Sequence, residues 1–191
     1  MTGDNRTDYL ITDRTTGALT AYLNGGHDTT AANNWRFNPV GQIASGLGPG
    51  VNARFGDIDG DGKADWIQLM AGGKTNIWKN NYPGDWSPLP DANAAGIGQP
   101  PSQIQFADVD NDGKVDYIWT DPLTGQPHVY HNKFPSHPVW VAGPYPDATS
   151  EGVSGACVIF GKVAEDAGAQ AVFVNPDTGG ISAYTDGKQS C

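Results

Sequence analysis

Residues 57–65 read Asp-Ile-Asp-Gly-Asp-Gly-Lys-Ala-Asp, and residues 108–116 repeat the pattern as Asp-Val-Asp-Asn-Asp-Gly-Lys-Val-Asp. The two stretches lie 51 residues apart (116 − 65 = 51). Carboxylates at every second position, with a glycine after the third, bring four acidic side chains and one backbone carbonyl around a single hard cation. Calcium takes about six to eight such oxygen ligands. Without a cation the carboxylates would repel one another, so the sequence predicts two calcium sites.

The residues around the two stretches indicate β-strands rather than the helices of an EF-hand. An EF-hand loop requires a bidentate glutamate at its twelfth position, whereas Gln68 and Trp119 stand there in this chain. Residues 66–69 and 117–120 follow the loops as runs of aromatic and aliphatic residues, which are typical of strands. Each predicted metal loop therefore connects two strands of a β-hairpin.

Both stretches belong to a longer repeat. An aromatic residue follows each loop, an Asn follows the next hydrophobic run, and a Trp comes after that Asn. Weaker copies occur at both ends of the chain, so that the repeats cover residues 1–48, 49–98, 99–152 and 153–191. Each complete copy predicts four short strands with Gly- and Pro-rich turns and no helical periodicity. This pattern is typical of a propeller blade, and we expect one all-β domain over residues 1–191.

The motif Phe-(Gly/Ala)-Asp-x-Asp-x-Asp-Gly-Lys-x-Asp, which begins at Phe55 and at Phe106, resembles the FG-GAP/VCBS repeat. This repeat builds integrin α propellers, fungal propeller lectins and modules appended to secreted microbial hydrolases. The resemblance implies a β-propeller of about four blades, each a four-stranded antiparallel sheet with calcium in its first hairpin. It also implies that positions one, three, five and nine provide side-chain ligands and that position seven provides its backbone carbonyl. These residues are Asp57, Asp59, Asp61, Lys63 and Asp65, and Asp108, Asp110, Asp112, Lys114 and Asp116.

The first and last repeats depart from the motif. The first begins inside its loop and keeps only Asp4 and Asp8, whereas in the last Lys162, Ala164 and Gln170 stand where ligands would be. We therefore expect calcium in two loops only. We also expect the first repeat to lack its first strand and the last to end after its third, which leaves strand edges that invite pairing.

The number of blades in the ring stays open. A closed disc of four blades, a half-propeller that pairs with a second copy, and one part of a larger ring all agree with four repeats. Propellers of the family usually have about seven blades, so the resemblance favours the second and third alternatives.

Composition agrees with a folded repeat protein. The 26 Gly and 14 Pro suit many tight turns, and no run of about 18 apolar residues predicts a membrane span. The formal net charge is −10, but eight of the 21 acidic residues lie in the two loops, where two calcium ions would return four charges. No basic stripe is present, which disfavours nucleic acid as a partner.

The chain contains two cysteines, Cys157 and Cys191, whose oxidation state would indicate the cellular location. A disulfide between them would close a loop of 34 residues (191 − 157 = 34) and stabilise the fold by about 3–4 kcal/mol. Two unrelated free thiols are the alternative, because spacing does not determine pairing. Together with calcium, the disulfide predicts a secreted protein. No apolar run of a signal peptide follows Met1, and a start inside the first loop is more typical of an expressed segment or of a fragment of a longer protein than of a natural N-terminus.

Candidate catalytic residues are weak, and we expect no enzyme activity. His128 and His131 are three residues apart on a predicted strand and therefore face opposite sides, which argues against a zinc site with His137. Ser154 lacks the context of a nucleophile elbow. The loop carboxylates are explained by calcium rather than by acid–base catalysis.

Aromatic residues recur at matched positions, and blade packing explains most of them. The alternative is carbohydrate recognition, in which an aromatic ring stacks on a sugar ring while Asn and Asp take the hydroxyls. The candidates for this role are Trp35, Tyr82, Trp86 and Trp140, with Asn33, Asn34, Asn80, Asn81 and Asn132 nearby. The leading hypothesis is a secreted, calcium-stabilised carbohydrate-binding module, either a lectin or the accessory module of a hydrolase. The competing hypothesis is a protein-interaction module that assembles through open blade edges.

Overall fold

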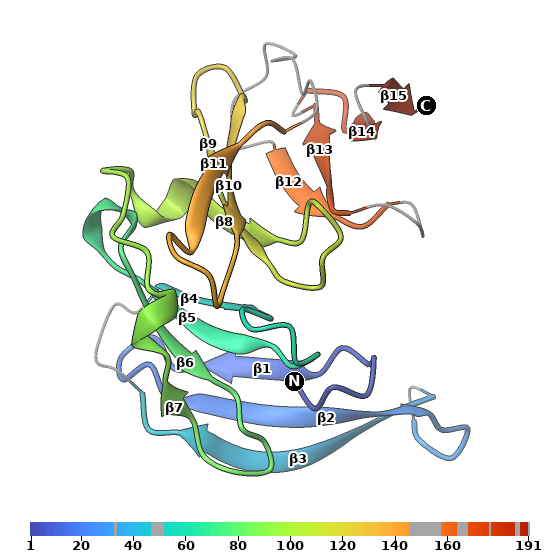
Figure 1. Ribbon diagram of the computed structural model, residues 1–191. Coiled ribbons are helices and arrows are strands. Elements are labelled where there is room, and N and C mark those ends of the chain that lie inside the picture. Colours follow the sequence, from blue (N-terminus) through green and yellow to red (C-terminus); the bar gives the residue numbers. More distant parts are fainter. Residues whose placement is uncertain are drawn as a thin grey trace.

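Figure 1 shows the computed structural model of the chain. It describes residues 1–32, 34–46, 52–145, 158–163, 168–175, 177–185 and 188–190. These residues form four antiparallel sheets in chain order, and none of them lies in an α-helix. Short 3-10 helices interrupt the connections at η1 (Ala71–Gly73), η2 (Pro90–Ala92) and η3 (Pro101–Gln103). The predicted all-β architecture is confirmed.

The sheets are meanders in which sequential strands pair with one another. The first contains β1 (Tyr9–Thr12), β2 (Leu19–His27) and β3 (Trp35–Ala44). The second contains β4 (Asn52–Gly56), β5 (Asp65–Leu69), β6 (Thr75–Lys79) and β7 (Ser87–Pro88). The third contains β8 (Ile104–Ala107), β9 (Asp116–Thr120), β10 (Pro127–Asn132) and β11 (Trp140–Gly143). The fourth contains β12 (Val158–Gly161), β13 (Gln170–Val174), β14 (Ile181–Thr185) and β15 (Lys188–Ser190).

The strand count corrects one expectation. The first sheet has three strands, as predicted, but the fourth has four, because β15 pairs with β14 from Ala183↔Ser190 to Thr185↔Lys188. After Tyr184 no Trp marks a last strand, as Trp35, Trp86 and Trp140 do in the other repeats. Strand pairing uses backbone groups, which any non-proline residue supplies.

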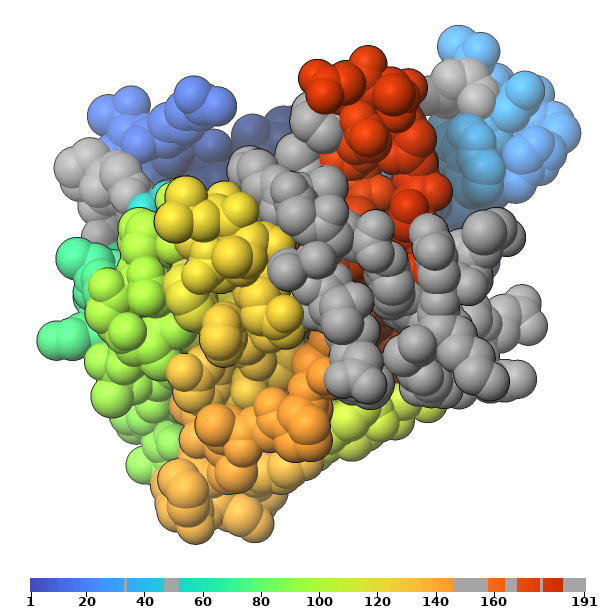
Figure 2. Space-filling view, turned by 90° about the horizontal axis from the view of Figure 1, so that it is seen from above, coloured from blue at the N-terminus to red at the C-terminus, as the bar shows by residue number. Residues whose placement is uncertain are grey.

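The sheets are stacked in a propeller-like order. The first strand of the second sheet, β4, contacts β8, and β8 contacts β12. The core lies between neighbouring sheets: the buried pair Ile67 and Ile77 of the second sheet packs with Phe106 and Trp140 of the third. On the surface seen in Figure 2, green residues of the second repeat lie beside yellow and orange residues of the third. Such shared cores are what a repeat array requires.

A buried aspartate–asparagine bridge organises each of the two complete repeats. In the second sheet, Asp65 is fully buried and accepts backbone N–H bonds from Ile58 (2.9 Å) and Asn80 (2.8 Å). The Asn80 side chain in turn donates to the backbone carbonyl of Ala64 (3.0 Å) and accepts from the N–H of Tyr82 (2.9 Å). The bridge therefore ties the hairpin loop to the end of the third strand of the sheet.

The same bridge recurs in the third sheet and also joins it to the second. Asp116 accepts from the N–H of Val109 (3.0 Å) and of Asn132 (2.8 Å). The Asn132 side chain donates to the carbonyls of Val115 (3.2 Å) and of Ile58 (2.8 Å), which belongs to the preceding repeat. Neighbouring loops are thus held together by a buried polar contact.

The first and fourth sheets contain variants of the bridge. Asp8 accepts from the N–H of Asn24 (2.9 Å), and the Asn24 side chain donates to the carbonyl of Thr7 (3.1 Å). In the fourth sheet, the side-chain oxygen of Gln170 accepts from the N–H of Val163 (2.7 Å). A hydrogen-bond acceptor at this position is therefore used even where the metal ligands of the sequence motif are lost.

Among the described residues, no helix has the length and apolar character required to cross a membrane.

We predict that Asn132→Ala destabilises the protein by about 2–4 kcal/mol, because it leaves buried backbone groups without partners. The matched control is Asn24→Ala, whose half-buried side chain makes the same kind of bond in the first sheet; we expect it to cost about 1 kcal/mol. Urea unfolding followed by fluorescence measures both values. Equal costs for the two variants would contradict the role of the contact between repeats.

Candidate functional site

The first acidic loop gathers three carboxylates. Ligand oxygens of Asp57, Asp59 and Asp61 all lie within 4.8 Å of one another. Asp57 accepts backbone N–H bonds from Gly60 (2.7 Å) and Gly62 (2.6 Å), both of which have positive φ angles. Burial raises the pKa of Asp57, and the neighbouring carboxylates add to this effect. The loop is therefore wrapped around a centre of negative charge.

The second loop folds in the same way. Oxygens of Asp108, Asp110 and Asp112 lie within 4.8 Å of one another, and Asp108 accepts from the N–H of Asp112 (3.1 Å) and of Gly113 (3.0 Å). Asn111 takes the place of Gly60 and adopts a φ of 58°, which asparagine tolerates better than most residues. Both predicted loops are thus assembled as clusters of converging carboxylates.

The ninth loop position lies deeper than the others. Asp65 and Asp116 are fully buried, and burial raises the pKa of both, to about 6 for Asp65. Asp65 does not belong to the group formed by the first three carboxylates of its loop, whereas Asp116 groups with Asp110 and His131. These two aspartates therefore lie beneath the loops, where each connects its loop to the third strand of the sheet.

Lysine ammonium groups occupy positions beside the loop carboxylates. Lys79 Nζ bonds to Asp59 and to Asp61, the latter at 2.8 Å, while Lys114 Nζ lies 2.7 Å from Asp112. The hydrogen bonds to Asp59 and Asp61 raise the pKa of Lys79. In addition, Asp59 Oδ1 is buried without a hydrogen-bond partner. Carboxylates that attract ammonium groups and retain a buried free oxygen fit a divalent cation.

Neither terminal repeat forms such a cluster among its described residues. Asp8 pairs with the amino terminus of Met1 at 3.0 Å, and Lys162 is exposed. Ala164 lies outside the described residues, as do Cys157 and Cys191.

We predict that calcium at about 100 times its Kd raises the melting midpoint by about 5–10 °C relative to EDTA, because the ion binds only the folded loops. Asp57→Asn and Asp108→Asn each remove part of this rise, whereas substitution of the exposed Asp91, which lies outside both loops, leaves it intact. Differential scanning calorimetry with and without EDTA measures the effect. An unchanged midpoint in EDTA would refute calcium binding by these loops.

A pocket opens between the first and second sheets. This first inter-sheet pocket has a volume of about 430 Å³. Its lining consists of Gln42, Ile43, Ala44, Ser45, Gly46, Trp66, Trp78, Asp85 and Trp86. The Trp66 ring lies 5.9 Å from Trp78 and 6.0 Å from Trp86, and the Trp86 indole donates to the carbonyl of Ile43 (3.2 Å). The pocket thus combines three indole rings with polar groups.

An equivalent pocket lies between the second and third sheets. This second inter-sheet pocket has a volume of about 210 Å³ and is lined by Ala94, Ala95, Gly96, Ile97, Tyr117, Tyr130 and Trp140. The Trp140 indole donates to the carbonyl of Ala92 (2.9 Å), as Trp86 donates to Ile43 in the first pocket. The Tyr117 hydroxyl is already bonded to the carbonyl of Gly73 (2.9 Å). Repetition thus produces two related pockets, of which the second is smaller and more apolar.

The predicted sugar-binding residues are spread over the molecule. Trp86 lies in the first inter-sheet pocket and Trp140 in the second, whereas Trp35 is half exposed and contacts His27 edge to face at 6.0 Å. The half-buried Tyr82 accepts a bond from Lys63 Nζ (3.2 Å) through its backbone carbonyl. The structure therefore does not bring these four residues into one site.

The candidate asparagines are equally dispersed. Asn80 and Asn132 are engaged in the buried bridges, and Asn81 donates to the Asp85 carbonyl (2.8 Å). Asn34 is exposed in a turn with a φ of 61°, and Asn33 lies outside the described residues.

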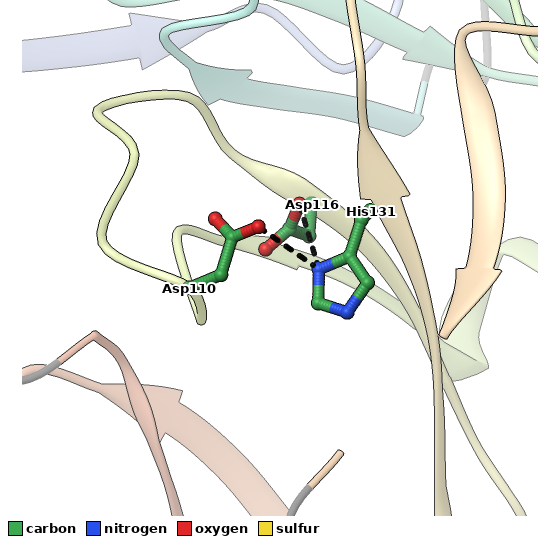
Figure 3. A group of neighbouring side chains, drawn as sticks. All are labelled: Asp110, Asp116 and His131. Atoms are coloured by element: carbon green, nitrogen blue, oxygen red, sulfur yellow. Dashed lines mark ion pairs between the residues drawn. The ribbon is translucent and has the colours of Figure 1, made fainter. Parts of the chain in front are cut away.

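Sequence reasoning missed two features of the sites. The sequence pattern explains recurring aromatic residues by blade packing, but Trp66 and Trp78 also line the first pocket beside Asp85. The strand pattern argues against a zinc site of His131 with other histidines, but the His131 ring points toward Asp110 and Asp116 of the second loop (Figure 3). A signal was present for His131, because it directly precedes the bridging Asn132, as Lys79 precedes Asn80.

The fold and these sites define a propeller-like all-β protein with two acidic hairpin loops and aromatic pockets between its sheets. The family model of the FG-GAP-like repeat matches residues 1–68, which confirms the predicted resemblance in that part of the chain. A comparison with curated proteins found no match.

Among solved structures, the chain is similar to a lectin of Agrocybe aegerita, reported with the structural basis of its specific recognition of non-reducing terminal N-acetylglucosamine. The TM-score is 0.59 at 15% sequence identity, and the similarity covers 100% of this chain and 49% of the lectin chain. The chain therefore spans about half the length of that structure, and the likeness concerns the fold.

Proposed function

We propose that this chain is a non-catalytic carbohydrate-binding module and that the first inter-sheet pocket binds one sugar unit of a glycan. The observation that carries this proposal is the composition of the pocket: three tryptophan rings beside the polar side chains of Gln42, Ser45 and Asp85. An aromatic ring stacks on the apolar face of a pyranose, while carboxylate and amide groups bond its hydroxyls. The volume of about 430 Å³ lies in the range of small-molecule sites.

The ligand class follows from the charges at the pocket. Asp85 lines it, and the chain has a formal net charge of −10. A negatively charged rim repels anionic sugars, so neutral hexoses and N-acetylhexosamines are the favoured ligands. The structural likeness to a lectin that recognises N-acetylglucosamine supports this sugar as the first probe.

The proposal also includes calcium binding, secretion, a disulfide and a propeller fold. Calcium in the two acidic loops is structural, with the ligand positions predicted from the sequence. Secretion and a disulfide between Cys157 and Cys191 agree with calcium binding outside the cell. The four sheets are blades of a propeller, and the chain spans about half the length of the lectin chain, because it covers 49% of it.

We predict that Trp78→Ala weakens binding of N-acetylglucosamine oligosaccharides at least about tenfold, because the stacking surface is lost. The matched control is Tyr130→Ala at the equivalent position of the second pocket, because Tyr130 pairs with Tyr117 as Trp78 pairs with Trp66. Titration calorimetry and a glycan array measure the effect.

Asp85→Ala provides a second variant, because its exposed side chain is not part of the core. We expect about tenfold weaker binding and an unchanged melting midpoint. Equal losses in the Trp78 and Tyr130 variants, or silence of the wild-type protein across neutral glycans, would contradict the proposal.

A second candidate function, self-assembly, is favoured by the open face of the first sheet. Tyr9 is 57% exposed, whereas Trp66 and Tyr117, its equivalents in the second and third sheets, are 3% and 2% exposed. Tyr9 and Tyr22 nevertheless lie 5.9 Å apart at 42°, the same geometry as Trp66 and Trp78. In the second and third sheets, the equivalent face is covered by the preceding sheet. We propose that a second copy of the chain covers this face of the first sheet.

We predict that light scattering detects a dimer at micromolar concentration and that Tyr9→Ser shifts the equilibrium to monomer, because the substitution removes an apolar anchor. Exchange of the exposed Leu123, which lies in a turn of the third sheet, serves as the control. A wild-type protein that stays monomeric over the whole concentration range would exclude self-assembly.

A further inference from the structure

The two acidic loops face different side chains from the third strand of their sheets. Lys79 and His131 occupy the same position, because each directly precedes the asparagine whose backbone N–H bonds to the last aspartate of the loop. Lys79 brings a positive charge to Asp59 and Asp61 of the first loop. His131 brings a ring nitrogen to the second loop, so the two loops differ in the donor atoms they offer.

His131 is placed as a metal ligand would be (Figure 3). Its Nδ1 atom lies 3.3 Å from Asp110 Oδ2 and 3.6 Å from Asp116 Oδ1. All three ligand atoms lie within 4.8 Å of one another. Donor atoms bonded at about 2.0–2.1 Å to a tetrahedral ion lie about 3.3–3.4 Å apart. The measured separations therefore suit one small divalent ion at the centre of the group.

The nitrogen is also buried and unused. His131 Nδ1 has no hydrogen-bond partner, although two carboxylates lie beside it. A buried polar atom without a partner is costly, and a metal ion would satisfy it. Asp116 bonds to two backbone N–H groups through its two oxygens, but each carboxylate oxygen has a further lone pair for a metal.

The backbone opposite the ring provides space for it. A Cβ atom added at Gly143 on β11 would lie 2.6 Å from His131 Nε2 and closer still to Cδ2. Glycine at this position therefore allows the imidazole to lie against β11 while its other nitrogen faces the loop. A side chain at residue 143 would push the ring out of this place.

The remaining charged groups near the site leave room for an ion. Lys133 Nζ lies 3.1 Å from Asp110 Oδ2 and is 43% exposed, so it can turn into solvent. Lys114 is held by Asp112 instead. Asp108 and Asp112 add negative charge beside Asp110.

We propose that the second loop is a mixed nitrogen–oxygen site that binds a borderline divalent cation such as Zn²⁺ through Asp110, Asp116 and His131. Calcium prefers oxygen ligands alone, whereas imidazole ligands suit zinc and its neighbours. The first loop offers only oxygen ligands, and the ammonium group of Lys79 stands where the second loop has His131. The first loop therefore prefers a hard cation such as calcium. The second loop then binds zinc in competition with calcium, whereas the first loop binds calcium alone, despite their shared sequence motif.

The test uses the full chain stripped of metal with EDTA and then dialysed. Zn²⁺ and Ca²⁺ are titrated separately, and Co²⁺ is added as a spectroscopic probe whose visible bands report nitrogen ligation. We expect His131→Ala to weaken Zn²⁺ binding at least about 30-fold, to change Ca²⁺ affinity less than about threefold and to alter the Co²⁺ spectrum. The matched control is His128→Ala, whose ring stacks on Trp119 at 4.5 Å, away from the loop; it should change none of these values.

Gly143→Ala provides a variant that keeps every ligand, and we expect it to weaken Zn²⁺ binding by displacing the ring. Melting curves without metal establish that each variant is folded, and His131→Gln replaces the alanine variant if that one is not. The proposal is overturned if the wild-type protein binds no Zn²⁺, if the His131 variant loses Zn²⁺ and Ca²⁺ affinity equally, or if the His128 variant behaves in the same way. Sugar binding is not part of this test, so its outcome is independent of the proposed function.

Discussion

The buried carboxylates of Asp65 and Asp116 are the contacts on which the rest of this structure depends. Each accepts two backbone N–H bonds, one from its own hairpin loop and one from the asparagine at the end of the third strand. A buried carboxylate is costly unless its oxygens are bonded, so these bonds determine where the loop and the strand must lie. The orientation of the loop, and with it the convergence of the other carboxylates, follows from this arrangement.

The same bridge places the side chain that precedes each asparagine. Lys79 and His131 are carried to the rim of their loops because Asn80 and Asn132 are anchored beneath them. The loops share a motif but face an ammonium group in one case and an imidazole in the other. The proposed difference in metal preference therefore originates outside the motif, in a strand that becomes a neighbour only when the sheet forms.

The pockets show a comparable divergence from a common geometry. In both, an indole donates to a backbone carbonyl near the end of the preceding sheet, at Ile43 on β3 or at Ala92 in η2. The first pocket is lined by the polar residues Gln42 on β3, Ser45 just after that strand and Asp85, whereas small apolar residues line the second. The repeat thus provides the aromatic side chains of both pockets. The residues at the end of the preceding sheet determine whether a pocket also has polar groups that can bond to a sugar. The role proposed for the first pocket depends on this difference.

The sequence alone determined the all-β class, the division into four sheets and the clustering of the loop carboxylates, because these depend on local alternation, turn residues and ligand spacing. Tertiary structure decided what depends on strand register. Asn24 pairs with Phe37, whereas Asn132 pairs with Trp140, so Phe37 rather than Trp35 is the structural equivalent of Trp140. Register also set His131 beside Asp110 and buried Asn132 in the bridge. Such contacts join residues far apart in the chain, and no local pattern specifies them, because they form only when the sheets pack.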